Sequence, residues 1–102
     1  MNVNEYLEST REKYRDGDML RIRQGIVCPD GFHVSVQASE GHYCRPRINH
    51  GPYSHVELGY PSEKVDEWME YAETPESPTS TVYGWVPVEV VETVLEKHGW
   101  EG

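Results

Sequence analysis

Hydrophobic and polar positions alternate most regularly in residues 20–38, on both sides of Pro29-Asp30-Gly31. Proline fixes φ at about −65°, so Pro29 and Asp30 suit the centre of a type I turn, with Gly31 next in the left-handed region. This three-residue loop sets the register of a β-hairpin. The resulting cross-strand pairs are Cys28–Phe32, Ile26–Val34, Gln24–Val36 and Ile22–Ala38. Nearly every apolar residue of the two strands then lies on one face.

The other face of this hairpin is polar, and its charged residues are arginines. Its members by the same register are Arg21, Arg23, Gly25, Val27, His33, Ser35, Gln37 and Ser39. Side chains alternate between the faces of a strand, so we expect these residues to form a flat, exposed and cationic face.

Helices are predicted at both ends of the chain. The capping-box pattern from Asn2 to Glu5 opens an N-terminal helix that runs to about Arg15, with Gly17 suited to end it, within residues 1–18. The first of two later helices has Ser62 as N-cap and the apolar stripe Val65, Trp68, Met69 and Ala72. The second places Pro87 at its first position, ends at Gly99 and has the stripe Val88, Val91, Val94, Leu95 and His98.

Further strands are expected at residues 53–59 and 81–86, with a shorter one at 42–45, and residues 74–80 read as a Pro- and Ser-rich loop. The sum is an α+β fold. A small antiparallel sheet built on the hairpin is packed by the two C-terminal amphipathic helices, with the N-terminal helix added. A chain of 102 residues suits a single domain, 1–102.

The charge changes this picture by its distribution. The net charge is −9; residues 21–55 carry four arginines against two acids, whereas residues 56–102 carry eleven acids against two lysines. An acidic chain is a poor non-specific binder of nucleic acid, which needs a basic surface. No apolar run is long enough to cross a bilayer and no signal peptide is visible, so we expect a cytoplasmic protein without membrane contact.

Four blocks carry a resemblance to a known group. They are residues 35–39 (SVQAS), 42–47 (HYCRPR), 56–63 (VELGYPSE) and 82–91 (VYGWVPVEVV). These blocks resemble small proteins of bacteriophages and prophages of gut bacteria that have no assigned activity. The resemblance implies a setting, the cytoplasm of a host bacterium, in which small proteins often act by binding: as inhibitors of host defence or as sponges for signalling nucleotides. It transfers no functional residue.

Metal binding and catalysis are both disfavoured. Six Cys and His residues lie between positions 28 and 55, but no Cys-x-x-Cys spacing occurs. The hairpin register separates Cys28 from His33, so His42 and Cys44, which could share a face of a strand, are the one plausible pair. Cys44 lies near His42, Arg45 and Arg47, which would favour its thiolate, yet an ordinary half-buried thiol is the more common case. We expect no metal, no cofactor and no enzymatic activity.

Two binding hypotheses from different classes remain. The first is an anti-CRISPR-like inhibitor whose acidic helices engage a host defence protein that handles nucleic acid, because opposite charge steers such encounters. Its partner-binding residues would be Asp66, Glu67, Glu70, Glu89, Glu92 and Glu96. The alternative is a sponge that sequesters a small anionic nucleotide, since guanidinium groups suit phosphate and aromatic rings stack on bases. Its ligand-binding residues would be Arg21, Arg23, Gln37, Tyr43, Arg45 and Arg47. A homo-oligomer is left open, as is whether the N-terminal helix packs on its own chain.

Overall fold

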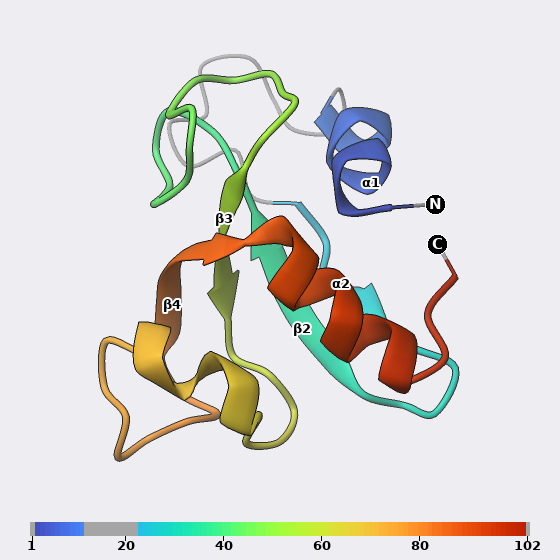
Figure 1. Cartoon of the computed structure of the whole chain (residues 1–102), viewed down its shortest axis with the longest axis vertical. Coiled ribbons are helices and arrows are strands. Elements are labelled where there is room, and N and C mark those ends of the chain that lie inside the picture. Colours follow the sequence, from blue (N-terminus) through green and yellow to red (C-terminus); the bar gives the residue numbers. More distant parts are fainter. Residues whose placement is uncertain (1, 12–22, 102) are drawn as a thin grey trace.

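The structure is a computed structural model, and it describes residues 2–11 and 23–101. Four antiparallel strands form one sheet in the order β1-β2-β3-β4, with α2 lying across it and α1 beyond one end (Figure 1). The elements are α1 (Val3–Thr10), β1 (Ile26–Val27), β2 (His33–Gln37), β3 (His55–Gly59), the 3-10 helix η2 (Asp66–Tyr71), β4 (Val82–Pro87) and α2 (Val88–Lys97). The α+β class and the antiparallel sheet are therefore confirmed.

The hairpin turn has the predicted geometry. Gly31 has a φ of +95°, the Cys28 N–H donates to Phe32 O at 2.8 Å, and Ile26 pairs with Val34. The apolar face is buried as expected, because Cys28, Phe32 and Val34 are all at most 4% exposed. The predictions for Arg21, Ile22, Arg15 and Gly17 lie outside the described residues.

The expectation of an exposed hairpin face is wrong for Arg23, and Gln37 and Ser39 of that face are buried as well. The backbone pairing of β1 with β2 begins only at Ile26. Before that, the Gln37 side chain bonds to the Arg23 backbone: its Oε1 accepts from Arg23 N at 2.7 Å and its Nε2 donates to Arg23 O at 2.7 Å. The Arg23 guanidinium turns beneath α1, donating to Leu7 O and to Ala38 O, and the residue is only 4% exposed. Arg23 therefore joins α1 to the hairpin.

The first helix packs on its own chain. The predicted capping box is present: Asn2 Oδ1 accepts from Glu5 N at 2.8 Å, and Asn2 N donates to Glu5 Oε1 at 3.1 Å. Val3 and Leu7 are buried in the core, and the Val3 N–H donates to the Glu92 carboxylate of α2 at 3.0 Å.

The middle helix differs from the prediction. Ser62 is no N-cap; its N–H and hydroxyl bond to the backbone of His33 instead, and the helix is a 3-10 helix that begins at Asp66, after the extended Val65. Trp68 is nevertheless fully buried. Of the predicted apolar stripe, Val65 and Trp68 are buried while Met69 and Ala72 are half-buried. The predicted type and start of the helix were wrong.

The last helix follows the prediction closely. Val91, Val94 and Leu95 are buried against the sheet, and Gly99 follows with a φ of +86°. Pro87 is the last residue of β4 and the N-cap of α2. The helix therefore begins at Val88, one residue later than predicted. Residues 42–45 form no strand beyond the single bridge from Arg45 to His55, and residues 74–80 form turns, as their composition predicts. Within residues 2–11 and 23–101, no helix combines the length and apolarity needed to cross a bilayer.

His98 fastens the end of α2 to the hairpin turn. Its ring stacks on Phe32 with centroids 4.1 Å apart, and its Nδ1 lies 2.6 Å from Asp30 Oδ2. The Phe32 N–H, followed by the His98 side chain, lowers the pKa of Asp30 from its ordinary value of 3.8.

We therefore expect Asp30→Asn to destabilise the protein in a pH-dependent way. A carboxyl whose pKa is lowered by folding stabilises the fold above its unfolded-state pKa, and this stabilisation is lost as the pH falls through the folded-state value. Urea unfolding should show a constant difference between wild type and Asp30→Asn well above pH 3.8 that shrinks below it. A difference that grows on acidification would contradict this reading.

Candidate functional site

The face of the sheet opposite α2 carries a cavity of about 460 Å³, here called the sheet-face pocket. The pairing of β2 with β3 forms its floor. Gln37 lies opposite Glu57 and Ser35 lies opposite Gly59, so these four residues are on the same face of the sheet. The pocket is lined by Ser35, Gln37, Gly41, His42, Tyr43, Arg47, Glu57, Gly59, Tyr60 and Val82.

A β-bulge in β4 shapes one side of this pocket. Val56 pairs with Val86 and Leu58 with Tyr83, so Gly84 and Trp85 together oppose Glu57. Bulges bend a strand and redirect its side chains. The Trp85 N–H accordingly donates to Tyr43 O at 3.0 Å, which fixes the 41–47 segment over the outer face.

Aromatic and guanidinium groups form a three-layer stack beside the pocket. The Trp85 and Tyr43 rings stack with centroids 4.8 Å apart, and the Arg47 guanidinium carbon lies 5.5 Å from the Tyr43 ring centre. Trp85 is 45% exposed, so this stack is accessible from solvent. A planar ligand could extend it.

Two exposed aromatic residues near the pocket have strained backbones. Trp85 has a φ of +50° and Tyr60, which is 58% exposed, has a φ of +53°. A bulky residue in the left-handed region costs on the order of 1–3 kcal/mol, and such residues gather at functional sites. Their position therefore favours a binding role for this end of the sheet.

Glu57 supplies a half-buried carboxylate to the pocket. Its Oε1 accepts from the Tyr43 N–H at 3.0 Å. Burial raises its pKa, with the Glu73 charge acting in the same direction and the Tyr43 N–H and Arg47 opposing it. In the part of the chain that the structure describes, no carboxylate comes within 4.0 Å of the Arg47 guanidinium, so Arg47 and Glu57 line one pocket without forming an ion pair.

Hydrogen bonds and burial fix the protonation or orientation of the other polar side chains of the pocket. Burial lowers the pKa of His42, whose Nδ1 lies 2.6 Å from Ser39 Oγ, so its ring is neutral at pH 7. The Gln37 amide is engaged by Arg23 and also donates to Ser35 Oγ at 2.9 Å. The Ser35 hydroxyl therefore keeps its own proton for an acceptor on a ligand.

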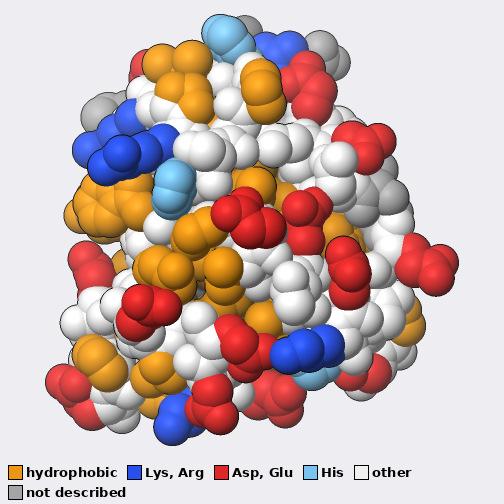
Figure 2. Space-filling view, viewed as in Figure 1, with side chains coloured by type: hydrophobic (Ala, Val, Ile, Leu, Met, Phe, Trp, Pro, Cys, Tyr) orange, Lys and Arg blue, Asp and Glu red, His pale blue; other side chains and the backbone are white. Residues whose placement is uncertain are grey.

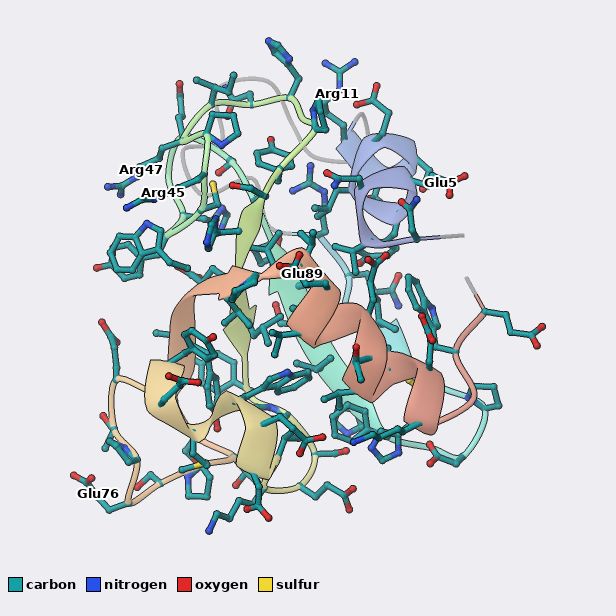
Figure 3. All side chains as sticks on the ribbon, in the orientation of Figure 1. Glu5, Arg11, Arg45, Arg47, Glu76 and Glu89 are labelled. Carbon is teal, nitrogen blue, oxygen red and sulfur yellow. The ribbon has the colours of Figure 1, made fainter. Side chains whose placement is uncertain are left out.

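The predicted ligand-binding residues are only partly brought together. Gln37, Tyr43 and Arg47 line the sheet-face pocket. Arg45 is exposed beside Arg47 (Figure 3) but is not part of the lining, while Arg23 is buried under α1 and serves the fold. Arg21 lies outside the described residues. The cationic site is therefore smaller than expected and sits on the 41–47 segment.

The predicted partner-binding acids have two kinds of surroundings. Glu67 forms an ion pair with Lys97 at 2.7 Å, and Glu92 accepts from the α1 backbone, so both make contacts within the chain. Asp66 lies 3.7 Å from Lys64. Five of the six acids are exposed, namely Asp66, Glu67, Glu70, Glu89 and Glu96, and Glu92 is half-buried. Acidic side chains are spread over the face on which α2 lies, with a basic cluster at its upper left where Figure 3 labels Arg45 and Arg47 (Figure 2).

The cysteines lie in the core. Cys44 is 1% exposed, its thiol donates to Ser39 O at 3.2 Å, and burial raises its pKa, so Cys44 lacks the accessible thiolate that a nucleophile needs. Cys28 is buried while His33 is exposed, as the hairpin register predicts. Over the described ranges, no three His, Cys, Asp or Glu side chains converge as a metal site.

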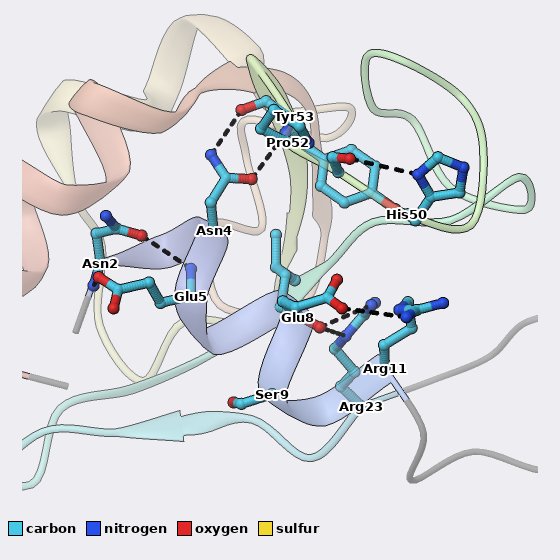
Figure 4. A pocket seen from close by; sticks show the side chains of 12 residues that line it. Asn2, Asn4, Glu5, Glu8, Ser9, Arg11, Arg23, His50, Pro52 and Tyr53 are labelled. Atoms are coloured by element: carbon cyan, nitrogen blue, oxygen red, sulfur yellow. Dashed lines mark hydrogen bonds and ion pairs between the residues drawn. The ribbon is translucent and has the colours of Figure 1, made fainter.

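A larger pocket of about 620 Å³ lies between α1 and the 50–53 segment (Figure 4). Much of its polar lining is paired internally: Asn4 bonds to both Tyr53 N and Tyr53 O, and Glu8 pairs with Arg11. Because its lining includes Arg11 and Arg23, which border the segment 12–22 outside the described residues, we assign no ligand to it.

Comparisons of the chain with protein-family models, curated proteins and solved structures found no match.

Sequence reasoning missed Glu57 and Trp85. Glu57 alternates with the buried Val56 and Leu58, which marks the outer face of a strand next to Gln37 only once the pairing of β2 with β3 is known. The isolated Gly84 within a strand pattern is the one local indication of a bulge.

Proposed function

We propose that this protein is a non-enzymatic binding protein that sequesters a small anionic ligand of the nucleotide type in the sheet-face pocket. One observation carries the proposal: Arg47, which lies over the Tyr43 ring, shares a pocket with the half-buried Glu57 without pairing to it, and Tyr43 in turn stacks on Trp85. This arrangement presents a flat aromatic surface, a positive charge and a hydrogen-bond acceptor within one cavity.

The chemistry of a nucleotide matches these three features. A base stacks on aromatic rings, with about 1–3 kcal/mol gained per base by this contact. A phosphate accepts hydrogen bonds from a guanidinium fork, and a base edge donates to a carboxylate. The cavity of about 460 Å³ falls within the range of roughly 300–1,000 Å³ that small-molecule sites occupy.

Arg47→Gln tests this function directly. In the wild-type protein, the Arg47 Nε donates to Glu40 O at 3.1 Å, and we expect the terminal guanidinium nitrogens of Arg47 to bind the phosphate. A hydrogen bond to a charged group contributes about 1.5–3 kcal/mol, so the Kd for a nucleoside monophosphate should rise about tenfold to a hundredfold in isothermal titration calorimetry. Lys64→Gln removes the same charge from an exposed site outside the pocket and should leave the Kd unchanged. Equal Kd values for wild type and Arg47→Gln would contradict the assignment.

A second candidate function is supported by the acidic surface. Five of the six acids expected to meet a partner remain exposed on η2 and α2: Asp66, Glu67, Glu70, Glu89 and Glu96. Together with the resemblance to phage proteins, this pattern supports an anti-CRISPR-like inhibitor that engages a nucleic-acid-handling defence protein of the bacterial host.

Charge reversal tests the second candidate. The triple variant Glu70→Lys, Glu89→Lys and Glu96→Lys changes only exposed acids and spares Glu92, which α1 needs. We expect it to weaken binding to a panel of purified defence nucleases by at least about tenfold at low salt, because steering by charge is lost. The matched control is the reversal of Glu8, Glu40 and Glu76, which lie off these helices. Equal effects of both triples, or tight binding that survives the first, would contradict a specific acidic interface.

A further inference from the structure

We infer that the base held in the sheet-face pocket is guanine, read by the carboxylate of Glu57. This inference rests on the proposed nucleotide-binding function and goes further by naming the base. It follows from the donors and acceptors that the lining side chains leave available.

Glu57 is a fixed acceptor at the floor of the pocket. Its Oε1 accepts from the Tyr43 N–H at 3.0 Å, which holds the carboxylate in place. Within the described residues, its Oε2 has no hydrogen-bond partner, and no other carboxylate lines the pocket. Solvent reaches this oxygen, so it can accept a hydrogen bond from a ligand. The pocket therefore offers an acceptor to a ligand that brings a donor to this place.

Guanine brings two. Its Watson–Crick edge presents the N1–H and the exocyclic N2 amine side by side, and a carboxylate can accept from both with charge-assisted bonds. Adenine offers one amine next to a bare ring nitrogen, which would face the Glu57 carboxylate without a proton. Hypoxanthine keeps the N1–H but lacks the N2 amine.

The neighbouring groups suit the rest of a guanine nucleotide. The Ser35 hydroxyl accepts from Gln37 Nε2, so its proton is left for a carbonyl oxygen such as O6. Tyr60, which lines the pocket and is 58% exposed, offers a ring on which the base can stack. Arg47, which lies over the Tyr43 ring, supplies positive charge for the phosphate.

The test is calorimetric titration of wild type with GMP, IMP, AMP and ribose 5-phosphate. We expect GMP to bind at least about tenfold more tightly than AMP or IMP, as one lost bond to a charged group predicts. Glu57→Gln should bring GMP down to the level of AMP and leave AMP within about twofold. The control is Glu73→Gln, which removes a carboxylate that acts on Glu57 only through its charge and does not line the pocket. It should keep the preference for GMP.

The outcomes separate the two proposals. Equal affinity of wild type for AMP and GMP, or an unchanged GMP preference in Glu57→Gln, would overturn the assignment of guanine while the nucleotide-binding function stands. Binding of none of the four ligands would overturn both. The ranking of ligands by wild type needs no variant, so it decides the matter even if Glu57→Gln does not fold.

Discussion

Replacing Trp68 with alanine is expected to lower the free energy of unfolding by about 3–5 kcal/mol. Trp68 is fully buried, and its ring centre lies 6.1 Å from that of Phe32 and 6.3 Å from that of Tyr83. Its helix, η2, has no side-chain N-cap, so the packing of Trp68 holds this segment against the sheet. The indole Nε1 has no hydrogen-bond partner in the described part of the chain, so the loss is one of packing.

An effect of this size is a large part of the 5–15 kcal/mol that keeps a typical domain folded. Urea unfolding followed by far-ultraviolet circular dichroism measures it. The control is Trp85→Ala, because Trp85 is 45% exposed and should cost under about 1 kcal/mol. A cost below about 1 kcal/mol for Trp68→Ala would show that the core is not organised around this residue.

Arg23→Met is expected to destabilise the protein by about 2–4 kcal/mol, since a buried group left without its partner costs about 1–3 kcal/mol. The guanidinium donates to Ala38 O at 2.7 Å, to Leu7 O at 3.2 Å and to Thr10 Oγ1 at 2.9 Å. Methionine fills a similar space but offers no donor, so these oxygens lose a partner at the contact between α1 and the hairpin.

The same unfolding experiment tests this prediction, with Arg45→Met as its control. The Arg45 side chain is exposed, so its replacement should change the free energy of unfolding by no more than about 0.5 kcal/mol. If the two variants were equally stable, Arg23 would be a surface arginine, as the alternation of the sequence predicted, and its described contacts would carry little energy.

Local rules predicted the parts of the fold that local chemistry decides. The turn at Pro29-Asp30-Gly31 set the hairpin register because φ is restricted at Pro29 and Gly31 accepts a positive value. The capping box at Asn2 and the stop at Gly99 were predictable for the same reason.

Non-local contacts decided the rest. Ser62 has the chemistry of an N-cap, but pairing with the backbone of His33 satisfies it instead. Arg23 was expected to face solvent because strand alternation was assumed for the residues before Ile26. There the Gln37 side chain, rather than a neighbouring strand, bonds to the Arg23 backbone. Glu57 joined the site through strand pairing and a bulge, neither of which a single sequence displays.

The position at which a nucleotide binds can be measured directly. Backbone amide resonances of the protein can be followed by two-dimensional NMR during titration with GMP. We expect shift changes concentrated at the sheet-face pocket, at Ser35, Tyr43, Arg47 and Glu57, with Asn4 and Tyr53 of the α1-side pocket unaffected. Changes centred on Asn4 and Tyr53, or none at saturating GMP, would contradict nucleotide binding in the sheet-face pocket.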